Sequence, residues 1–150
     1  MSAIKIDTIN LSIIKELRQG RKSFKKIAER LEITENTVRA RVNKMMNIGL
    51  LDINGQVDIE QIPHHQLVII GVKLKTTDMF QKGEEFSRVK GVVSVSVVTG
   101  RYDLILLVIF NEEYGLQEFY AQEVSRIEEV QSLETFVVYK GYNLKVPYIL

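Results

Sequence analysis

Residues 21–50, RKSFKKIAERLEITENTVRARVNKMMNIGL, contain two short helical patterns that meet at a tight turn. In the first pattern, Ser23 is placed as the N-cap, and apolar residues follow at the three-and-four spacing of one buried face. In the second, Thr34 is placed as the N-cap, and Val38 and Val42 lie on the inward face. Two helices joined by a turn of three or four residues predict a helix-turn-helix.

The outward face of the second helix carries side chains suited to reading DNA. Asn and Arg can each make two hydrogen bonds to a base edge, and Ala allows close approach. An unpaired basic cluster at the start of the first helix opposes the helix dipole, which nearby phosphates would explain. We expect DNA contacts from Lys22, Ser23, Lys25, Lys26, Thr34, Glu35, Asn36, Thr37, Arg39, Ala40, Arg41, Asn43 and Lys44. The alternative is a solvated helical hairpin.

The composition is that of a globular protein of one domain or two small ones. Of the 150 residues, 45% are hydrophobic and 26% are charged. No apolar run approaches the ~18 residues that a membrane span requires, and no signal-peptide pattern opens the sequence, so we expect a cytoplasmic protein. The absence of Cys excludes disulfides and thiolate metal sites.

The net charge of +1 conceals a division along the chain. Residues 1–55 hold 11 Lys and Arg against 6 Asp and Glu, a net charge of +5. Residues 56–150 hold 9 against 13, a net charge of −4. This division predicts a polyanionic partner, double-stranded DNA, for the front part only.

The segments before and after the helix-turn-helix complete the front part of the chain. Residues 7–18 predict an opening helix that Asp7 or Thr8 caps and Gln19-Gly20 ends. After it and the helix-turn-helix pair, Asn54-Gly55 lies between apolar, alternating residues and predicts a β-wing. We expect a helix-turn-helix domain over 1–53, a wing and linker over 54–65, and a third region over 66–150. In the linker, the adjacent His64 and His65 have no further His to complete a metal site, so we expect none.

Residues 66–150 alternate between strand and helix patterns. Strands are expected over 68–74, 92–98, 104–110 and 133–139. One helix should follow Asp78, with Met79, Phe80, Phe86 and Val89 on its apolar side. A second should be capped by Asn111, with Leu116, Phe119, Tyr120, Val124 and Ile127 on one side. The order βαββαβ predicts a ferredoxin-like α+β domain with both helices on one face of an antiparallel sheet.

The other face of this sheet is also expected to be apolar. Residues 104–110 are apolar at every position, whereas a strand with one face in water should alternate. Leaving these side chains in water would lose roughly 1.5–3 kcal/mol of burial free energy per side chain. Because large exposed apolar patches mark interfaces, we expect a homodimer with the two sheets packed face to face.

The ordered combination of these features resembles the Lrp/AsnC (leucine- and asparagine-responsive, "feast/famine") transcription regulators over essentially the whole chain. In the rear part the resemblance rests on Thr99-Gly100 and Tyr102-Asp103, which match the family's Gly-x-Tyr-Asp pattern. In the front part it rests on Ile6-Asp7, Ile13-Ile14, Leu17, Arg21, Ile27-Ala28, Thr34, Thr37-Val38, Arg41-Val42 and Gly49.

The resemblance implies homodimers that assemble further, often into octamers, bind DNA and respond to amino acids or related small molecules. It implies an effector site between dimers, with no cofactor, formed by Gly100, Arg101, Tyr102, Asp103 and Thr135. A carboxylate such as that of Asp103 can receive an α-ammonium group, and Gly allows close backbone approach. The alternative is a turn in which Asp103 bonds backbone amides.

Two departures from the family pattern bear on the effector and on the linker. The last strand of the family tends to open with two threonines one residue apart, but here Leu133 takes the first place. Fewer polar contacts to an amino acid would remain, which leaves open another effector or none. The segment after Gly49 is a residue shorter than in relatives and carries Asn54-Gly55.

Other classes of function are disfavoured by the same residues. An RNA-binding βαββαβ domain needs exposed aromatics on its central strands, whereas 104–107 is Leu-Ile-Leu-Leu in an acidic part of the chain. An acyl-phosphate hydrolase of similar architecture would need Arg and Asn to converge, but Arg101 and Asn111 flank a strand. We therefore expect no enzyme activity. An effector-independent architectural DNA-binding protein remains an alternative.

Overall fold

The structure is a computed structural model that describes residues 6–18, 20 and 22–150. The chain divides into two compact units whose boundary falls between Asn54 and Gly55, and each unit is described by itself. The expected helix end at Gln19 and the family residue Arg21 lie outside the described residues.

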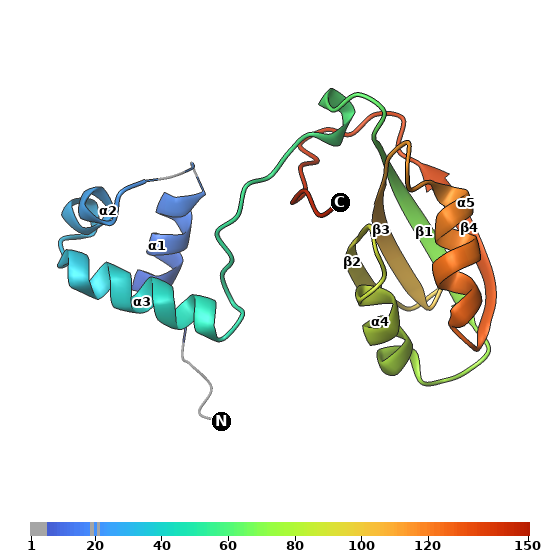
Figure 1. The fold of residues 1–150 in the computed structure, drawn as a ribbon. Helices are drawn as coiled ribbons and strands as arrows, with labels where there is room; N and C mark the ends of the chain where they lie inside the picture. The colour runs from blue at the N-terminus through green and yellow to red at the C-terminus, as the bar shows by residue number, and fades with distance from the viewer. Residues whose placement is uncertain (1–5, 19, 21) are drawn as a thin grey trace. The chain divides into compact units, whose positions relative to one another are not determined.

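The first unit contains three helices, α1 (Thr8–Leu17), α2 (Phe24–Leu31) and α3 (Glu35–Asn47) (Figure 1). Asp7, Ser23 and Thr34 cap them, each accepting a hydrogen bond from a backbone N–H of the first turn. Between α2 and α3, Glu32 adopts a left-handed conformation with φ of 54° and turns the chain sharply. These contacts produce the expected helix-turn-helix.

The core of the first unit is small. It is formed by residues from all three helices, all at most 5% exposed: Ile13, Ile27, Ala28, Val38, Val42 and Met45. Half-buried apolar residues, including Phe24, Leu31 and Leu51, surround this cluster. The three-helix core therefore follows the apolar spacing of the sequence.

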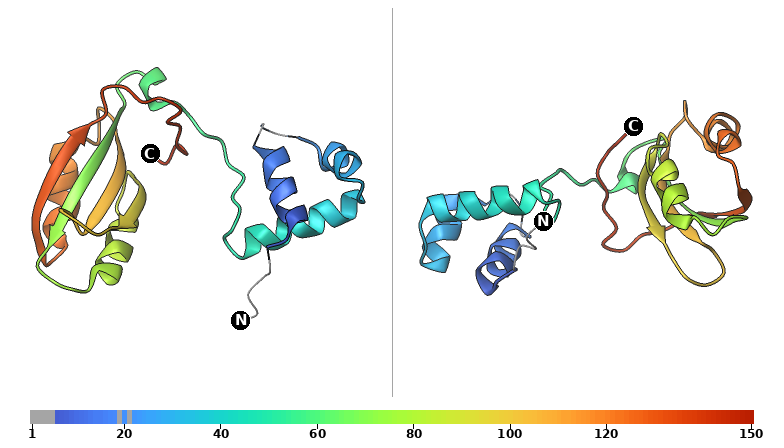
Figure 2. Two further views of the ribbon diagram at one scale, coloured as in Figure 1. Left: turned by 180° about the vertical axis from the view of Figure 1, so that it is seen from behind. Right: turned by 90° about the horizontal axis from the view of Figure 1, so that it is seen from below.

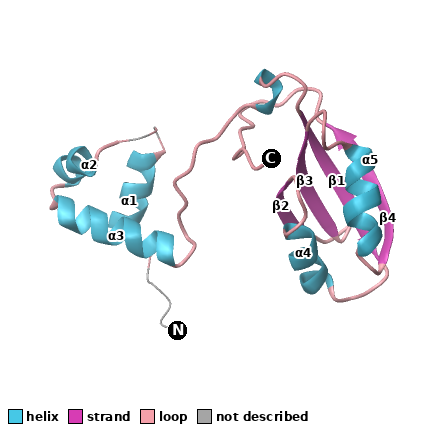
Figure 3. Cartoon of the chain, in the orientation of Figure 1, coloured by secondary structure: helices cyan, strands magenta, loops and turns pink. Residues whose placement is uncertain are grey.

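The predicted β-wing is wrong. Residues 51–56 form no strand (Figure 3). A two-residue Asn-Gly hairpin turn of type I′ needs positive φ at both residues, and neither Asn54 nor Gly55 has it. The apolar residues that flank the turn are used elsewhere. Leu51 packs on the helical core, and Val57 pairs with Val146 as an isolated antiparallel bridge.

The second unit contains a four-stranded antiparallel sheet in the order β2-β3-β1-β4. Its strands are β1 (Gln66–Leu74), β2 (Val92–Val97), β3 (Leu104–Phe110) and β4 (Val130–Val137). In register, Ile70 lies opposite Leu106 of β3 and Thr135 of β4. The short β2 forms one edge, and its pairing with β3 is irregular between Val92 and Ser94. This is the predicted ferredoxin-like order.

The helical segments that follow β1 and β3 cover one face of the sheet, whereas a short 3₁₀ helix (Ile59–Gln61) before β1 packs on the other. The covering segments are α4 (Met79–Ser87) and a continuous helical stretch made of α5 (Leu116–Glu118), a π-helix (Phe119–Glu123) and a 3₁₀ turn (Val124–Arg126). Phe86 of α4 and Phe119 of the π-helix are both fully buried, and they belong to one cluster with Val68, Ile70 and Leu106. Viewed from behind (Figure 2, left), the strands face the viewer and this helical stretch lies behind them.

Two details of these helices differ from the prediction. Phe80 was expected on the buried side of α4 but is 77% exposed. Asn111 does not cap the second helix, because its side chain accepts from the backbone N–H groups of Glu113 and Tyr114 in a turn before it. Gly115 begins that helix instead, and Glu118 bonds back to its N–H at 3.0 Å. The apolar spacing thus located the helix but not its first residue.

The opposite face of the sheet is only partly covered. Leu67 and Ile109 are covered by Ile59 and Val146, which come from the segments before β1 and after β4. Across the rest of this face lie half-buried Ile69, Ile105, Leu107 and Tyr102 and the 43%-exposed Phe136.

Membrane and metal features were searched among residues 6–18, 20 and 22–150. No helix in this part of the chain is long and apolar enough to cross a membrane. Within the same residues, no three His, Cys, Asp or Glu side chains are grouped so that they could hold a metal ion.

Candidate DNA-binding surface and effector region

The expected DNA-contacting residues lie on or beside the exposed face of α3 and at the start of α2. The opposite side of α3 is buried through Val38, Val42 and Met45, so the polar residues of this helix point outward. Ser23 and Thr34 use their hydroxyls as caps, with distances of 3.3 Å to the Lys26 N–H and 3.1 Å to the Thr37 N–H. The exposed members of the predicted set are Ser23, Lys25, Lys26, Thr34, Glu35, Asn36, Arg39, Ala40, Asn43 and Lys44.

Arg39 is held in place by two neighbours. Its guanidinium lies 2.8 Å from a Glu35 carboxylate oxygen one turn earlier on α3 and 5.3 Å from the centre of the Phe24 ring. The side chain is still 55% exposed. Arg39 is thus oriented at the junction of α2 and α3 while its remaining donors are open to a base edge.

Lys22 is paired inside the unit. Its ammonium donates to the Glu16 carboxylate, which also accepts from Arg30 at 3.0 and 3.2 Å. The hydrogen bonds from Lys22 and Arg30 lower the pKa of the Glu16 carboxyl. This contact ties the end of α1 to α2, so Lys22 is less available to phosphates than Lys25 and Lys26.

Arg41 links α3 to α1, a role that sequence reasoning missed. Its Nη1 lies 2.9 and 2.7 Å from the two Asp7 carboxylate oxygens and 2.9 Å from Asn10 Oδ1. Asn10 is the buried polar residue of the unit, at 5% exposure. The backbone N–H of Asn10 and the Arg41 guanidinium lower the pKa of Asp7. The two residues are 34 positions apart in the sequence, so local patterns do not predict this contact.

Replacing Arg41 by Ala should therefore destabilise the first unit. We expect the thermal midpoint of its helical circular-dichroism signal to fall by about 5 °C, because buried Asn10 loses its donor. Lys44→Ala, on the exposed face of the same helix, is the control and should leave the midpoint unchanged. A purely phosphate-binding Arg41 would instead give an unchanged midpoint and a flatter salt dependence of DNA binding.

The turn between β2 and β3 holds Asp103 through contacts within the chain. One carboxylate oxygen lies 2.8 Å from Lys73 Nζ and the other accepts from the Leu74 N–H at 2.8 Å. These two donors hold the pKa of the Asp103 carboxyl below its usual value. The contacts are those of the alternative interpretation, in which Asp103 bonds the backbone rather than a ligand.

Of the remaining predicted effector residues, Gly100 lies in the same turn, and Arg101 and Tyr102 lie on a different side of the sheet from Thr135. The Tyr102 hydroxyl donates to the Glu134 carboxylate, which raises the pKa of Tyr102, and Arg101 Nη2 lies 2.9 Å from the same carboxylate. These three are on the face opposite α4 and α5. Thr135 faces the helices, where its hydroxyl lies 3.2 Å from that of Tyr120. The structure therefore groups Arg101 and Tyr102 with Glu134, a residue that the sequence interpretation missed, and separates Thr135 from them.

Gly71 makes room for the Tyr102 ring, because a Cβ on Gly71 would lie 2.7 Å from ring carbons. Replacing Gly71 by Ala should cost about 1–3 kcal/mol of unfolding free energy in urea denaturation, the range typical of overpacking. In a Tyr102→Ala background the same change should cost much less. An equal cost in both backgrounds would show that the ring is not the obstacle.

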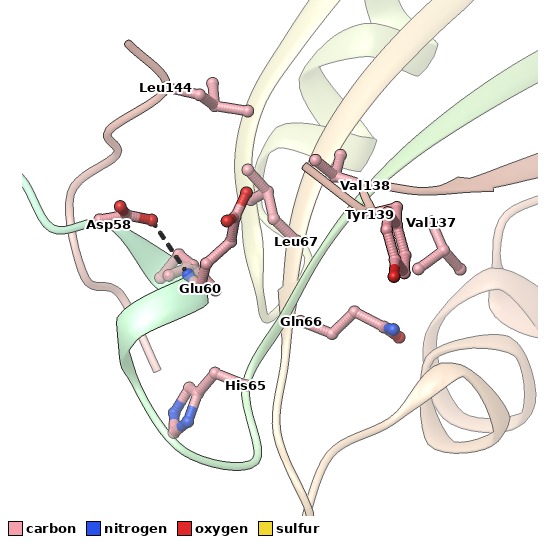
Figure 4. A pocket seen from close by; sticks show the side chains of 10 residues that line it. Asp58, Glu60, His65, Gln66, Leu67, Val137, Val138, Tyr139 and Leu144 are labelled. Carbon is pink, nitrogen blue, oxygen red and sulfur yellow. Dashed lines mark hydrogen bonds between the residues drawn. The ribbon is translucent and has the colours of Figure 1, made fainter. Parts of the chain in front are cut away.

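An open cavity of about 460 Å³ lies at the other end of the sheet (Figure 4). Residues before β1 and after β4 line it, including Glu60, His65, Tyr139 and Leu144. Glu60 accepts from Lys140 Nζ at 2.7 Å and from the Gly141 N–H, and His65 Nε2 lies 3.0 Å from the Tyr148 hydroxyl. These polar groups join two segments of the chain rather than standing free.

Comparisons with known protein families and relatives agree along the chain. The AsnC-type helix-turn-helix domain matches residues 6–46, and the Lrp/AsnC ligand-binding domain matches residues 67–145, more than half of the chain. The chain belongs to the Lrp/AsnC family. The HTH-type transcriptional regulator PH0140 of Pyrococcus horikoshii is 26% identical over 137 residues, which cover 90% of this chain and 87% of that protein. This family member is therefore a DNA-binding transcription regulator and not an enzyme.

Solved structures share the fold of this Lrp/AsnC regulator. The crystal structure of PH0061 has a TM-score of 0.80 at 20% identity and covers 95% of this chain and 99% of its own. The transcriptional regulator NMB0573 of Neisseria meningitidis, solved as a complex with L-Met, has a TM-score of 0.69 at 18% identity and covers 91% of each chain. At these identities the two likenesses concern the fold.

Proposed function

We propose that this Lrp/AsnC regulator binds specific DNA sequences as a homodimer and that an amino acid or related small molecule modulates the binding. The observation that carries the proposal is the exposed row on α3 beside the Lys25–Lys26 start of α2. Asn36, Arg39 and Asn43 would read base edges in the major groove, and the lysines would contact phosphates.

The sheet face opposite α4 and α5 supports the dimer. Ile69 and Ile105 are half-buried there, Leu107 is half-buried beside the Ile59–Val146 cluster, and Phe136 is 43% exposed. Packing this face against its copy would remove these side chains from water. Assembly of dimers into an octamer, as the family resemblance implies, forms a further part of the proposal.

The cluster of Arg101, Tyr102 and Glu134 supports an effector that carries both a carboxylate and an ammonium group. Arg101 is 76% exposed and its guanidinium could bind a carboxylate, whereas the Glu134 carboxylate could bind an ammonium. The Neisseria protein of the same fold was solved with L-Met. Arg101 and Glu134 bond each other but their side chains are 76% and 41% exposed, whereas the Asp103 side chain is 17% exposed and Thr135 faces the helices. The proposed effector contacts are therefore Arg101, Tyr102 and Glu134.

Selection of bound duplexes from a random DNA pool tests this proposal. We expect a two-fold symmetric site whose half-sites are spaced by about 10 base pairs or a multiple. The selected duplex is then titrated with and without each of the 20 amino acids. Failure to enrich any sequence would refute specific binding, and an unchanged affinity with every amino acid would favour the effector-independent architectural role.

A further inference from the structure

The segment after β4 runs back to the segment before β1 (Figure 1), and hydrogen bonds join the two. The backbone N–H groups of Val57 and Val146 each donate to the carbonyl of the other, at 2.8 and 3.0 Å. Lys140 and Gly141 both donate to Glu60. We call residues 140–148 the C-terminal strap. It contacts Val57 and Glu60, which are part of the linker between the helix-turn-helix and β1.

The strap is anchored in a buried cluster and not only by surface contacts. Val146 is 4% exposed and Ile59, on the linker side, is 3% exposed. Both pack with Leu67 of β1 and Ile109 of β3. The His65 and Tyr148 rings, with centres 5.5 Å apart, add an aromatic contact. The linker is therefore fixed from Val57 onward, well before β1 begins at Gln66.

The strap thereby shortens the free chain between the units. Leu51 still belongs to the first unit, since its N–H donates to the Met45 carbonyl at 3.2 Å. Residues 52–56 are exposed and lie between Leu51, the last anchored residue of the first unit, and Val57, the first anchored residue of the second. If release of the strap also frees Ile59 from Leu67 and Ile109, the free chain runs over 52–65. At ~3.3–3.6 Å per residue, its maximal reach would rise from roughly 18 Å to roughly 50 Å.

We infer that the C-terminal strap is a specificity-determining element that limits which half-site spacings the dimer can bind. The inference rests on the proposed function, because a dimer reaches its second half-site through two such linkers. The effective concentration of the second helix-turn-helix falls roughly as the −3/2 power of linker length, which gives about a fivefold loss per released linker. A longer linker also reaches more distant half-sites, so the preference for one spacing should broaden.

Four variants and the wild type test the strap. Val146→Asp places a charge in the cluster and releases the strap. Glu60→Ala is a milder release that removes the acceptor of Lys140 and Gly141 and spares the buried residues. Insertion of nine Gly and Ser residues between Asn54 and Gly55 lengthens the linker with the strap intact. Tyr142→Ala, at an 84%-exposed strap residue, is the control.

Each protein is titrated with duplexes that carry one half-site or two half-sites at a series of spacings. For Val146→Asp and the insertion, we expect a loss of about 5- to 20-fold at the wild-type spacing, a flatter dependence on spacing, and unchanged single-half-site affinity. Glu60→Ala should change in the same direction by less, and Tyr142→Ala should match the wild type. Hydrogen exchange over residues 55–62 should be faster in both release variants only.

A disulfide provides the converse measurement. The chain has no Cys, and Val57 and Val146 form a hydrogen-bonded antiparallel pair with Cα atoms ~5.5 Å apart, within disulfide range. The oxidised Val57→Cys, Val146→Cys protein should keep the wild-type spacing preference when Glu60→Ala is added, whereas the reduced protein should not.

The outcomes separate the strap from the proposed function. Enrichment of no sequence by the wild type would refute the proposed function. A wild type with one preferred spacing, together with release variants that keep it despite faster exchange, would refute the strap inference alone. An insertion variant that keeps the wild-type preference would also refute the inference, because linker length would then not set the spacing.

Discussion

Replacing Ile105 by Glu should convert the dimer into a monomer of 17.3 kDa and weaken binding to two-half-site DNA by about 100-fold or more. Ile105 is half-buried on β3, opposite Gly71 of β1 and Ser96 of β2, on the face that we expect to meet its copy. A charge there would be buried without a partner in the dimer but solvated in the monomer. Sedimentation velocity measures the mass, and fluorescence titration measures the affinity.

Phe80→Glu is the matched control for this change. Phe80 is 77% exposed on α4, on the helical side of the same unit, and it is likewise an apolar residue replaced by an acid. This variant should remain dimeric or larger and should bind two-half-site DNA with the affinity of the wild type. A monomeric wild type at micromolar concentration, or an Ile105→Glu protein that remains dimeric, would refute the face-to-face arrangement.

Replacing Arg39 by Ala should cost about 1–3 kcal/mol of binding free energy on the selected site and relax the base preference at one position in each half-site. The physical reason is the loss of a side chain that can make two hydrogen bonds to a guanine and that Glu35 and Phe24 orient beforehand. Binding to unrelated DNA should change much less. Repeating the random-pool selection with the variant would show which position loses its preference.

Lys25→Ala provides the contrast for Arg39→Ala. Lys25 is exposed at the first turn of α2, where its charge would meet phosphates. Its loss should weaken binding to all sequences alike and reduce the slope of log affinity against log salt by about 1. Equal effects of the two variants on sequence preference and on salt slope would contradict this division of roles.

Local patterns in the sequence predicted most of the fold. The caps Asp7, Ser23 and Thr34 follow from residue type at the start of an apolar period, and their effects extend over a single turn. The apolar content of β3 likewise predicted an apolar second face, where Ile109 is fully buried and Ile105 and Leu107 are half-buried. Each of these inferences depends on neighbours within a few residues.

Contacts between distant residues account for what the sequence did not predict. Asn54-Gly55 is a strong local turn signal, but Leu51 and Val57 pack into two different cores, so the chain stays open there. Arg41 bonds a residue 34 positions earlier, and Glu134 meets Tyr102 over a separation of 32. At the effector region, the cross-strand register brings Glu134 beside Gly71 and Tyr102, and this register is not visible from residue types.

The outer rim of the sheet has a consequence for how this protein behaves when it is made and stored. Strand β2 reads Val-Val-Ser-Val-Ser-Val and carries neither charge nor proline, the residues that commonly keep such rims from recruiting further chains. Its irregular start near Val93 interrupts the regular pairing there. In crowded or partly unfolded preparations, we expect a strand from another chain to add at the remaining part of this rim, residues 94–97.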